Sequence, residues 1–377
     1  MDYNQFALEL HEKYRGKIST VLRDNNDLTR ELLSTYYSPG VGAVSTAIAK
    51  NPELLPRYTW TNNLVAVISD GSAILGLGDL GPKAAMPVME GKALLFKHFA
   101  DIDSVPIVLD VHSADEIVAA VKAIAPSFGA INLEDISAPK CFEVEERLKA
   151  ELDIPVFHDD QHGTAIVTLA GLINAAKVTG RDLQSSRVVV VGAGAAGTAI
   201  IKLLHTYGVR TILAVDSKGI ISDDRTDLND EKKALKPFLT ASLVGSLTDA
   251  MTGADIFIGV SKAGLLTPEL VASMAKDPIV FALANPIPEI MPEVAKQNGV
   301  AVIATGRSDF PNQVNNAVAF PGIFRGALDR QVLSITDNHK LAAAEALAAL
   351  VDEPNAENII PSVFDERVVP TVATVIK

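Results

Sequence analysis

Acidic side chains follow two neighbouring strands that the sequence predicts. Glu134 and Asp135 come directly after a short apolar run. Asp159 and Asp160 come directly after the next one. Because the carboxyl ends of neighbouring parallel strands meet at one edge of a sheet, these carboxylates are expected to lie close together. They would repel one another unless a cation or protons intervened. Oxygen ligands favour Mg²⁺ or Mn²⁺ over zinc. The alternative is that these residues merely end strands, with Asp160 capping the next helix.

Two further side chains could carry protons. Lys92 lies at an expected helix start near a glycine-rich loop, and a lysine removed from water can act as a base because its pKa falls. Tyr37 precedes a Ser-Pro-Gly turn and could donate a proton. Taken alone, each has an ordinary interpretation, as a solvated lysine and a half-buried tyrosine. For His158 and His162, core or surface positions are favoured over metal ligation.

Three asparagines lie in the second half of the chain. Asn285 follows an expected strand, and Asn315 and Asn316 lie in a late loop. Their amides could hydrogen-bond a carboxylate substrate, or merely shape turns.

A glycine-rich segment predicts a dinucleotide site. Residues 187–197 read RVVVVGAGAAG, four valines and then a complete G-x-G-x-x-G, followed by a helical pattern and a strand over 211–215. In this context the first glycine makes a tight turn, the second lets the backbone approach a pyrophosphate, and the third packs helix against strand. The helix N-terminus then faces the phosphates. The residues expected to contact the cofactor are Gly192, Gly194, Ala195, Ala196, Gly197, Asp216, Ser217, Lys218, Ser261 and Asn285.

The choice of cofactor depends on Asp216, at the end of the second strand, about 20 residues after the last glycine. Its carboxylate can accept hydrogen bonds from a ribose 2′-hydroxyl and would repel a 2′-phosphate. This favours NAD over NADP. Lys218 could still partner a phosphate, so NADP stays possible.

The composition limits the class of protein. With 377 residues and 48% hydrophobic content, the chain is long enough for two globular domains with a large core. No apolar run reaches the length of a membrane span, and the first residues lack the apolar segment of a signal peptide. The single cysteine, Cys141, excludes an intrachain disulfide and fits the cytoplasm. A net charge of −13 argues against nucleic acid or an anionic membrane as a partner.

Alternating strands and helices must position these side chains. The alternation runs over residues 105–157 and again over 187–304, which predicts an α/β protein with two largely parallel sheets flanked by helices, the second of Rossmann type. The apolar helix expected over 163–178 would be a buried connection. We expect a substrate and metal domain over residues 1–160 and an NAD-binding domain with a C-terminal helix over residues 161–377. Residues 63–81 instead predict two strands joined by an Asp-Gly hairpin turn, and helices are expected over 4–15, 27–36 and 91–99.

Taken together, the motifs resemble the malic enzymes in their short bacterial form. The match covers nearly the whole chain in eight short motifs in the right order. They are YSPGVG from Tyr37, GLGDLG from Gly76, EGKALLFK from Glu90, LEDI from Leu133, FHDDQHGTA from Phe157, VGAGAAG from Val191, LANPI from Leu283 and NNAVAFPG from Asn315.

The resemblance implies a role for each candidate residue. Glu134, Asp135 and Asp160 would hold the divalent metal. Lys92 would be the general base and Tyr37 the general acid. The reaction that it implies is the NAD-dependent oxidative decarboxylation of malate to pyruvate and CO₂, in a cytoplasmic homodimer.

The resemblance also places Asn285, Asn315 and Asn316 against malate, with Asp159 supporting the site. One position departs from the family pattern. Large members carry a substrate-binding arginine beside the Asp-Gly turn, where this chain has Ser72-Ala73. Arg307 is a candidate to neutralise the second substrate carboxylate instead.

Three alternatives stay open. An oxaloacetate decarboxylase or a malolactic-type enzyme that keeps its cofactor bound would show the same motifs. An amino-acid dehydrogenase shares the domain order and often uses a lysine, but the acidic pairs count against it. A non-catalytic NAD-binding sensor has no positive support.

Overall fold

The computed structural model describes residues 3–24, 26–74 and 77–377, and its first sheet is fully parallel. The strands are β1 (Leu64–Ser69), β2 (Asp103–Val108), β3 (Ala130–Leu133) and β4 (Val156–His158), in the order β2-β1-β3-β4. Every residue of β1, β3 and β4 is buried, as expected for parallel strands covered on both faces. The carboxyl ends of β3 and β4 therefore lie side by side.

The second sheet has the order β10-β9-β8-β5-β6-β7. Its strands are β5 (Arg187–Val191), β6 (Thr211–Asp216), β7 (Gly219–Ile220), β8 (Ile256–Gly259), β9 (Ile279–Ala282) and β10 (Val302–Thr305). All neighbours pair parallel except β6 and β7. The α/β fold class with two largely parallel sheets is confirmed.

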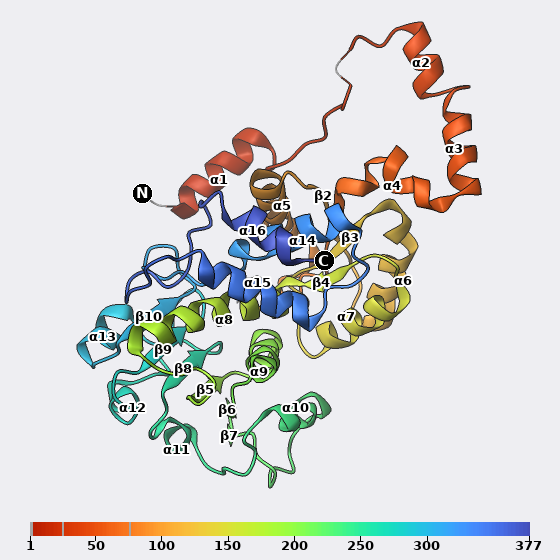
Figure 1. The fold of residues 1–377 in the computed structure, drawn as a ribbon. Helices are drawn as coiled ribbons and strands as arrows, with labels where there is room; N and C mark the ends of the chain where they lie inside the picture. Colours follow the sequence, from red (N-terminus) through yellow and green to blue (C-terminus); the bar gives the residue numbers. More distant parts are fainter. Residues whose placement is uncertain (1–2, 25, 75–76) are drawn as a thin grey trace.

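Helices lie around both sheets and also form a projecting N-terminal segment (Figure 1). They are α1 (Tyr3–Tyr14), α2 (Arg30–Tyr36), α3 (Val41–Lys50), α4 (Leu55–Tyr58), α5 (Pro82–Ala100), α6 (Ala114–Ile124), α7 (Lys140–Glu151), α8 (Asp159–Thr179), α9 (Ala195–Tyr207), α10 (Asp230–Leu235), α11 (Leu247–Met251), α12 (Pro268–Ala272), α13 (Pro292–Gln297), α14 (Phe320–Arg330), α15 (Asp337–Ala349) and α16 (Val368–Val375), with 3₁₀ turns η1 (Pro52–Leu54), η2 (Trp60–Asn63), η3 (Ala125–Ser127), η4 (Lys236–Phe238) and η5 (Asn316–Val318). In the part of the chain that the structure describes, none of them has the length and hydropathy that a membrane crossing needs.

Helix α8 joins the two sheets and is buried along most of its length. Val65 of β1 and Val188 of β5 belong to one apolar core, to which α8 contributes Ile166 and Leu169. The helix begins at Asp159, earlier than the sequence pattern predicted, because the polar residues of its first turn interrupt the apolar run. The acidic pair after β4 therefore lies in the first turn of a helix.

The hairpin predicted over residues 63–81 is wrong. Strand β1 is bonded on one edge to β2 and on the other to β3, both parallel, so neither edge is free for the segment that follows it. Part of the predicted second strand falls on residues 75 and 76, outside the described residues. The segment instead crosses the end of the sheet, where Ala73 N donates to Asp135 O over 3.0 Å.

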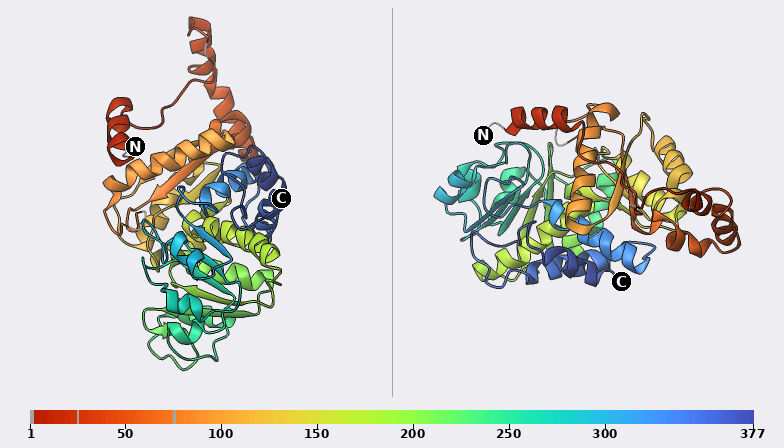
Figure 2. Two further views of the ribbon diagram at one scale, coloured as in Figure 1. Left: turned by 90° about the vertical axis from the view of Figure 1, so that its left-hand side faces the viewer. Right: turned by 90° about the horizontal axis from the view of Figure 1, so that it is seen from above.

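The first fifty residues contribute little to this core. Helices α1, α2 and α3 contain no buried residue. In Figures 1 and 2, α2 and α3 project from the body of the molecule as an arm. We call residues 28–50 the arm from here on.

Candidate active site

Three of the predicted site residues meet in one buried cluster. The Nζ atom of Lys92, on α5, lies 2.8 Å from Oε1 of Glu134 and 2.6 Å from Oδ2 of Asp159. Glu134 follows β3, and Asp159 opens α8 directly after β4. All three side chains are buried. Lys92 is therefore not a solvated surface lysine, and the sheet edge brings it to two of the acidic residues that the sequence pattern paired.

Opposing charges define the electrostatics of the cluster. Burial acts to lower the pKa of Lys92, but attraction by Asp159 and Glu134 outweighs it, and the pKa is raised above the ordinary lysine value. The fall in pKa expected from the sequence is therefore wrong, because two carboxylates accompany the lysine into the interior. Burial raises the pKa of Glu134, and it raises the pKa of Asp159 to about 6 against the attraction of Lys92. The pKa of Asp160 is also raised to about 6, first by burial. One ammonium thus faces an excess of carboxylates.

Asp135 turns the chain at the end of β3. It adopts a left-handed conformation, with φ of +53°, that residues other than glycine rarely take. Its backbone N–H donates to Oδ2 of Asp160 over 2.8 Å. Such conformations concentrate at functional sites, where the surrounding structure holds them. The bond ties the two acidic pairs together across the sheet edge.

The second half of the chain closes over the cluster. A Cβ atom at Gly163, one turn after Asp159, would lie 1.9 Å from Asp159 Oδ1 and 2.9 Å from the Cβ of Asn316, so only glycine leaves room for both. The ring of Phe320 lies 4.2 Å from the Lys92 ammonium, within cation–π range. Asn316 is thus beside the site. The side chain of Asn315 accepts from Ala317 N over 2.9 Å and caps η5.

A buried glutamate supports β4 from behind, and the sequence analysis missed it. The Glu145 carboxylate accepts from His158 N over 3.1 Å and lies 2.8 Å from His162 Nε2 and 2.6 Å from Lys149 Nζ. Burial lowers the pKa of His162 to about 4, so its ring is neutral at pH 7. His158 is fully buried, as favoured from the sequence. Nothing in the sequence separates Glu145 from the exposed acidic residues of the same helix.

The glycine-rich turn has the geometry that a dinucleotide needs. A Cβ at Gly197 would lie 1.8 Å from Gly192 O, so the third glycine permits close packing of α9 on β5. Gly192 itself has φ of +111°. A Cβ at Gly194 would meet nothing within 4 Å, which leaves open space where a pyrophosphate would approach. Ala195 and Ala196 form the first turn of α9, whose amides face that space.

Asp216 has two cationic partners that the sequence analysis missed. Its carboxylate accepts from the Arg225 guanidinium at 3.1 and 3.2 Å and from Lys232 Nζ at 2.6 Å. Burial acts to raise the pKa of Asp216, but these bonds outweigh it and lower the pKa to about 2. Lys218 donates only its backbone N–H to Asp216, because its ammonium pairs with Asp227 at 2.7 Å. The local charge is therefore set by a carboxylate between two cations.

The other expected cofactor residues lie at the carboxyl edge of the second sheet. Ser217 and Lys218 form the exposed turn between β6 and β7. The fully buried Glu289 carboxylate accepts from Ser261 N and from Ala284 N, each over 3.0 Å. These bonds hold the loops after β8 and β9 together, and Asn285 follows on the exposed side.

Two predicted residues lie elsewhere. Tyr37, directly after α2, is 70% exposed, and α2 belongs to the arm that projects from the body of the molecule (Figure 1). Arg307 is paired with Asp309 at 2.6 Å, and its guanidinium lies 5.1 Å from the centre of the Phe310 ring. Arg307 is thus already neutralised within its own loop.

The acidic cluster can be tested against the expected metal. Among the described residues, no three His, Cys, Asp or Glu side chains converge as ligands of an ion. The Glu134 carboxylate pairs with the Lys92 ammonium, and the Asp160 carboxylate accepts a hydrogen bond from the backbone N–H of Asp135. The donor chemistry nevertheless fits a hard cation. Oδ1 of Asp159 and Oδ1 of Asn132 are buried acceptors without a hydrogen-bond donor, which is costly. The carboxylates at this sheet edge also outnumber the single Lys92 ammonium, and the excess negative charge favours a bound cation.

Known proteins resemble this chain over almost its whole length. Residues 161–376 match the family model described as malic enzyme, NAD binding domain, and residues 12–115 and 111–149 match that described as malic enzyme, N-terminal domain. The chain belongs to the malic enzyme family. A bifunctional malic/malolactic enzyme of Bacillus subtilis is 55% identical over 377 residues, which cover 99% of this chain and 92% of that protein.

Further members of the malic enzyme family agree in sequence and in fold. An NAD-dependent malic enzyme of Geobacillus stearothermophilus is 58% identical over 91% of this chain and 72% of its own length. The crystal structure of an NAD-dependent malic enzyme from Thermotoga maritima superimposes with a TM-score of 0.96 at 50% identity, covering 98% of both chains. NADP-dependent malic enzymes are also among the relatives. The predicted resemblance, the presence of an NAD-binding domain and membership in a family of enzymes are confirmed.

Proposed function

We propose that the protein catalyses the oxidative decarboxylation of L-malate to pyruvate and CO₂ with reduction of NAD, and that the reaction depends on Mg²⁺ or Mn²⁺. The observation that carries this proposal is the buried cluster of Lys92, Glu134 and Asp159, which α8 connects to a dinucleotide-binding sheet. The NAD-dependent malic enzymes of Geobacillus stearothermophilus and Thermotoga maritima support it.

In this mechanism the chain's own residues move the protons. When bound, NAD would supply the acceptor for the hydride from C2 of malate, and a divalent cation would supply charge stabilisation at the C2 oxygen. Lys92 is an ammonium in this cluster, so it first passes a proton to the adjacent Asp159 carboxylate and then, as the free amine, takes up the proton of the C2 hydroxyl. Its two carboxylate partners hold the amine in place and favour the protonated form that results. After CO₂ leaves, Tyr37 gives a proton to C3 and pyruvate forms. Glu134, Asp135 and Asp160 would hold the cation.

Asn316 and Asn285 are the amides proposed to contact malate. Asn316 lies beside Asp159 and Gly163, and Asn285 follows β9 at the edge that faces the cofactor. Asn315, which caps η5, would act by shaping the same turn or by contacting malate directly.

A malolactic reaction is the second candidate, because the Bacillus subtilis relative is described as bifunctional. The deciding experiment incubates the protein with L-malate, NAD and Mn²⁺ and measures NADH, pyruvate and lactate. Oxidative decarboxylation predicts NADH and pyruvate in equal amounts. Lactate without net NADH would establish the malolactic reaction. Pyruvate formed only from added oxaloacetate would leave a decarboxylase.

Cofactor choice gives a separate prediction at Asp216. In Asp216→Ser, the ratio of kcat/KM for NAD to that for NADP is expected to fall by on the order of 10²-fold. The carboxylate occupies both Arg225 and Lys232 and would repel a 2′-phosphate. Its removal frees two cations, which form strong charge-assisted bonds to phosphate. Steady-state kinetics with both cofactors at saturating malate and Mn²⁺ measure the ratio.

Two further variants are matched controls for Asp216→Ser. Adding Arg225→Ala to it should remove much of the gain with NADP, because one released cation is lost. Lys218→Ala should change the ratio little, since that ammonium is exposed and pairs with Asp227. A wild-type preference for NADP, or an unchanged ratio in Asp216→Ser, would show that Asp216 does not face the ribose.

A further inference from the structure

A fully buried carboxylate in the second half of the chain has no part in the proposed reaction. Glu289 lies between β9 and α13 and is 0% exposed. Burial raises its pKa, and the groups that act against this rise are backbone N–H donors and not cations. A buried charge is costly unless hydrogen bonds compensate it. The role of Glu289 must therefore be sought in the backbone donors that it holds.

Each oxygen of Glu289 holds a different loop. Oε1 accepts from Ser261 N in the loop after β8, and Oε2 accepts from Ala284 N in the loop after β9, each over 3.0 Å. A Cβ at Gly259, the last residue of β8, would lie 2.4 Å from the Cδ of Glu289. Only glycine there leaves room for the carboxylate. We call Glu289 with its two amide donors the carboxylate clamp.

A neutral side chain of the same shape cannot replace this clamp. A carboxylate accepts hydrogen bonds at both oxygens, whereas a glutamine amide has one acceptor oxygen and one NH₂ donor. In Glu289→Gln, the NH₂ group would face one of the two backbone N–H donors, and that donor would lose its partner. An unpaired buried donor is costly, so one of the loops is expected to move.

The two clamped loops border the crevice in which a dinucleotide binds. From β5 the chain continues to β6 on one side, whereas β8 and β9 lie on the other side of β5. In open sheets of this kind, the ligand lies outside the carboxyl ends of the strands, across the point where the strand order reverses. A Cβ at Gly192 would lie 2.7 Å from Val260 O, so the loop after β8 directly adjoins the glycine-rich turn.

The position of the crevice assigns one half of the cofactor to each side. Asp216, at the end of β6, is the residue proposed to face the adenosine ribose. The nicotinamide half would then extend over the loops after β8 and β9, where Ser261 and Asn285 are exposed. Asn285 follows the clamped Ala284 directly, and a Cβ at Gly306 would lie 3.2 Å from its Nδ2 atom. The clamp therefore lies beneath the nicotinamide side of the crevice.

We propose that Glu289 is a positioning residue, which acts through Ser261 and Asn285 to set the nicotinamide ring for hydride transfer. The inference rests on the proposed function, in which NAD takes the hydride from malate. Glu289 itself is buried beneath the two loops and reaches neither substrate nor cofactor. Since the adenosine half lies on the other side of β5, the clamp should affect the nicotinamide half alone.

The test compares NAD with ADP, which contains the adenosine and pyrophosphate but lacks the nicotinamide riboside. Calorimetric titration without malate or metal measures both affinities in Glu289→Gln. The Kd for ADP should stay within about twofold of the wild-type value, and the Kd for NAD should rise about tenfold through the loss of one buried hydrogen bond. A merely structural role would weaken the binding of both ligands equally.

Kinetics give a second readout of ring position. In Glu289→Gln, kcat should fall about 10²-fold, because a displacement on the order of 1 Å is enough to disturb a reacting geometry. The deuterium isotope effect on kcat, measured with malate labelled at C2, should increase, since hydride transfer becomes slower than the other steps. An unchanged isotope effect together with equal losses of NAD and ADP affinity would overturn the proposal.

Gly259→Ala displaces the carboxylate without altering it and gives an independent variant should Glu289→Gln fail to fold. It should weaken NAD binding but not ADP binding. In a Glu289→Ala background the added methyl group has room, so Gly259→Ala should have little further effect. Fully additive effects on NAD affinity would show that Gly259 does not act through Glu289, and would contradict the clamp.

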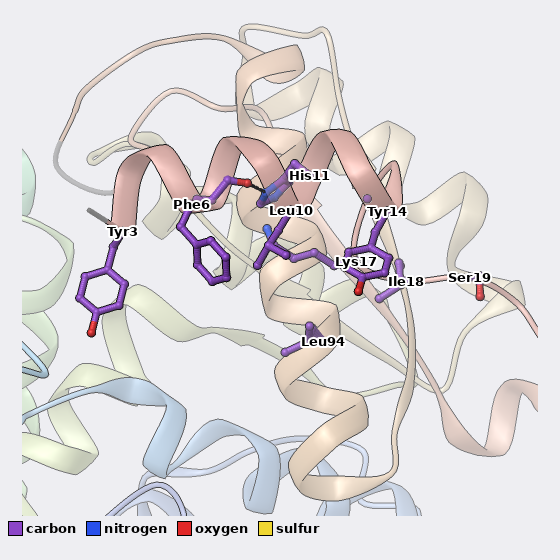
Figure 3. A pocket seen from close by; sticks show the side chains of 11 residues that line it. Tyr3, Phe6, Leu10, His11, Tyr14, Lys17, Ile18, Ser19 and Leu94 are labelled. Atoms are coloured by element: carbon purple, nitrogen blue, oxygen red, sulfur yellow. Dashed lines mark hydrogen bonds between the residues drawn. The ribbon is translucent and has the colours of Figure 1, made fainter. Parts of the chain in front are cut away.

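Two controls test whether the effects are specific. Glu293→Gln makes the same change at an exposed position of α13 and should leave both affinities unchanged. Leu94→Ala removes an apolar side chain that lines the pocket between α1 and α5 (Figure 3). Because α5 packs on the first sheet, any loss of packing there should leave the ratio of NAD to ADP affinity unchanged. If the wild type forms no NADH from malate, the proposed function fails, but the two affinities still test the clamp.

Discussion

Lys92→Ala is expected to lower kcat for malate oxidation by about 10³-fold, equivalent to about 4 kcal/mol of transition-state stabilisation. The ammonium is the sole cation in contact with Glu134 and Asp159 among the described residues. Removing it takes away the proposed proton acceptor for the C2 hydroxyl. It also leaves two buried carboxylates facing each other, which is costly for the fold as well. Loss of chemistry and loss of folding must therefore be measured separately.

Three measurements separate the two effects. Affinity for NAD should stay near the wild-type value, because the glycine-rich turn lies on the other sheet. Lys97→Ala is the matched control on the same helix, since Lys97 is half exposed and pairs with Asp101 and Asp103. Small primary amines added to Lys92→Ala should restore part of the activity if the missing group is an amine in an otherwise folded site. Activity within tenfold of the wild type in Lys92→Ala would contradict the assignment.

The sequence was sufficient to predict the parts of the fold and site that depend on local pattern. The runs before Glu134 and Asp159 read as buried strands, and parallel pairing brings their carboxyl ends to one edge. The glycine spacing after β5 was enough to predict the turn, because a side chain at the first or the third glycine would clash with nearby atoms. At the strand ends and at the glycine-rich turn, a short segment and one rule of chain geometry are enough to predict the structure.

Contacts between distant segments could not be predicted in this way. Arg225 and Lys232 reach Asp216 from a loop and a helix whose sequences show no phosphate or carboxylate motif. Glu145 looks like an ordinary acidic residue of an amphipathic helix until α7 packs behind β4. The hairpin prediction failed for the same reason, because the partners of β1 come from residues 103–108 and 130–133. The order of the strands in the sheet decides which distant residues surround a side chain, and the local hydrophobic periodicity of a segment carries no information about that order.

Tyr37 shows a further limit of the sequence. Its motif indicates a role in chemistry, and its turn is predicted by Ser-Pro-Gly, but neither feature says which site it serves. The helices around it bury no residue, so no hydrophobic pattern ties them to one face of the body. Only the structure shows that α2, which Tyr37 follows directly, projects from the body of the molecule.

Asp160→Asn is expected to weaken Mn²⁺ binding by at least about 10²-fold, or about 2.7 kcal/mol, and to reduce malate turnover about 10³-fold. The substitution is chosen because the amide oxygen of asparagine can still accept the bond from Asp135 N–H that ties the two strand ends together. It removes the negative charge while keeping the shape of the side chain. Carboxylate oxygens are the ligands that Mn²⁺ and Mg²⁺ prefer, so the loss of one charged ligand is felt directly in affinity.

Mn²⁺ binding without malate is measured by the electron paramagnetic resonance signal of the free ion. The rise in Tm that the ion causes is an independent measure. A ligand that binds only the folded state stabilises it by RT ln(1 + [L]/Kd), so at the same Mn²⁺ concentration the rise in Tm should be larger in the wild type than in Asp160→Asn. Asp153→Asn, an exposed position in the loop before β4, should behave like the wild type. In metal-free buffer, Asp160→Asn should be at least as stable as the wild type, because the substitution removes one negative charge from a group of carboxylates that repel one another. An unchanged Mn²⁺ affinity would exclude Asp160 as a ligand and leave it the role of joining the two strand ends through Asp135 N. A metal-free loss of stability would show that the carboxylate is needed for the fold itself.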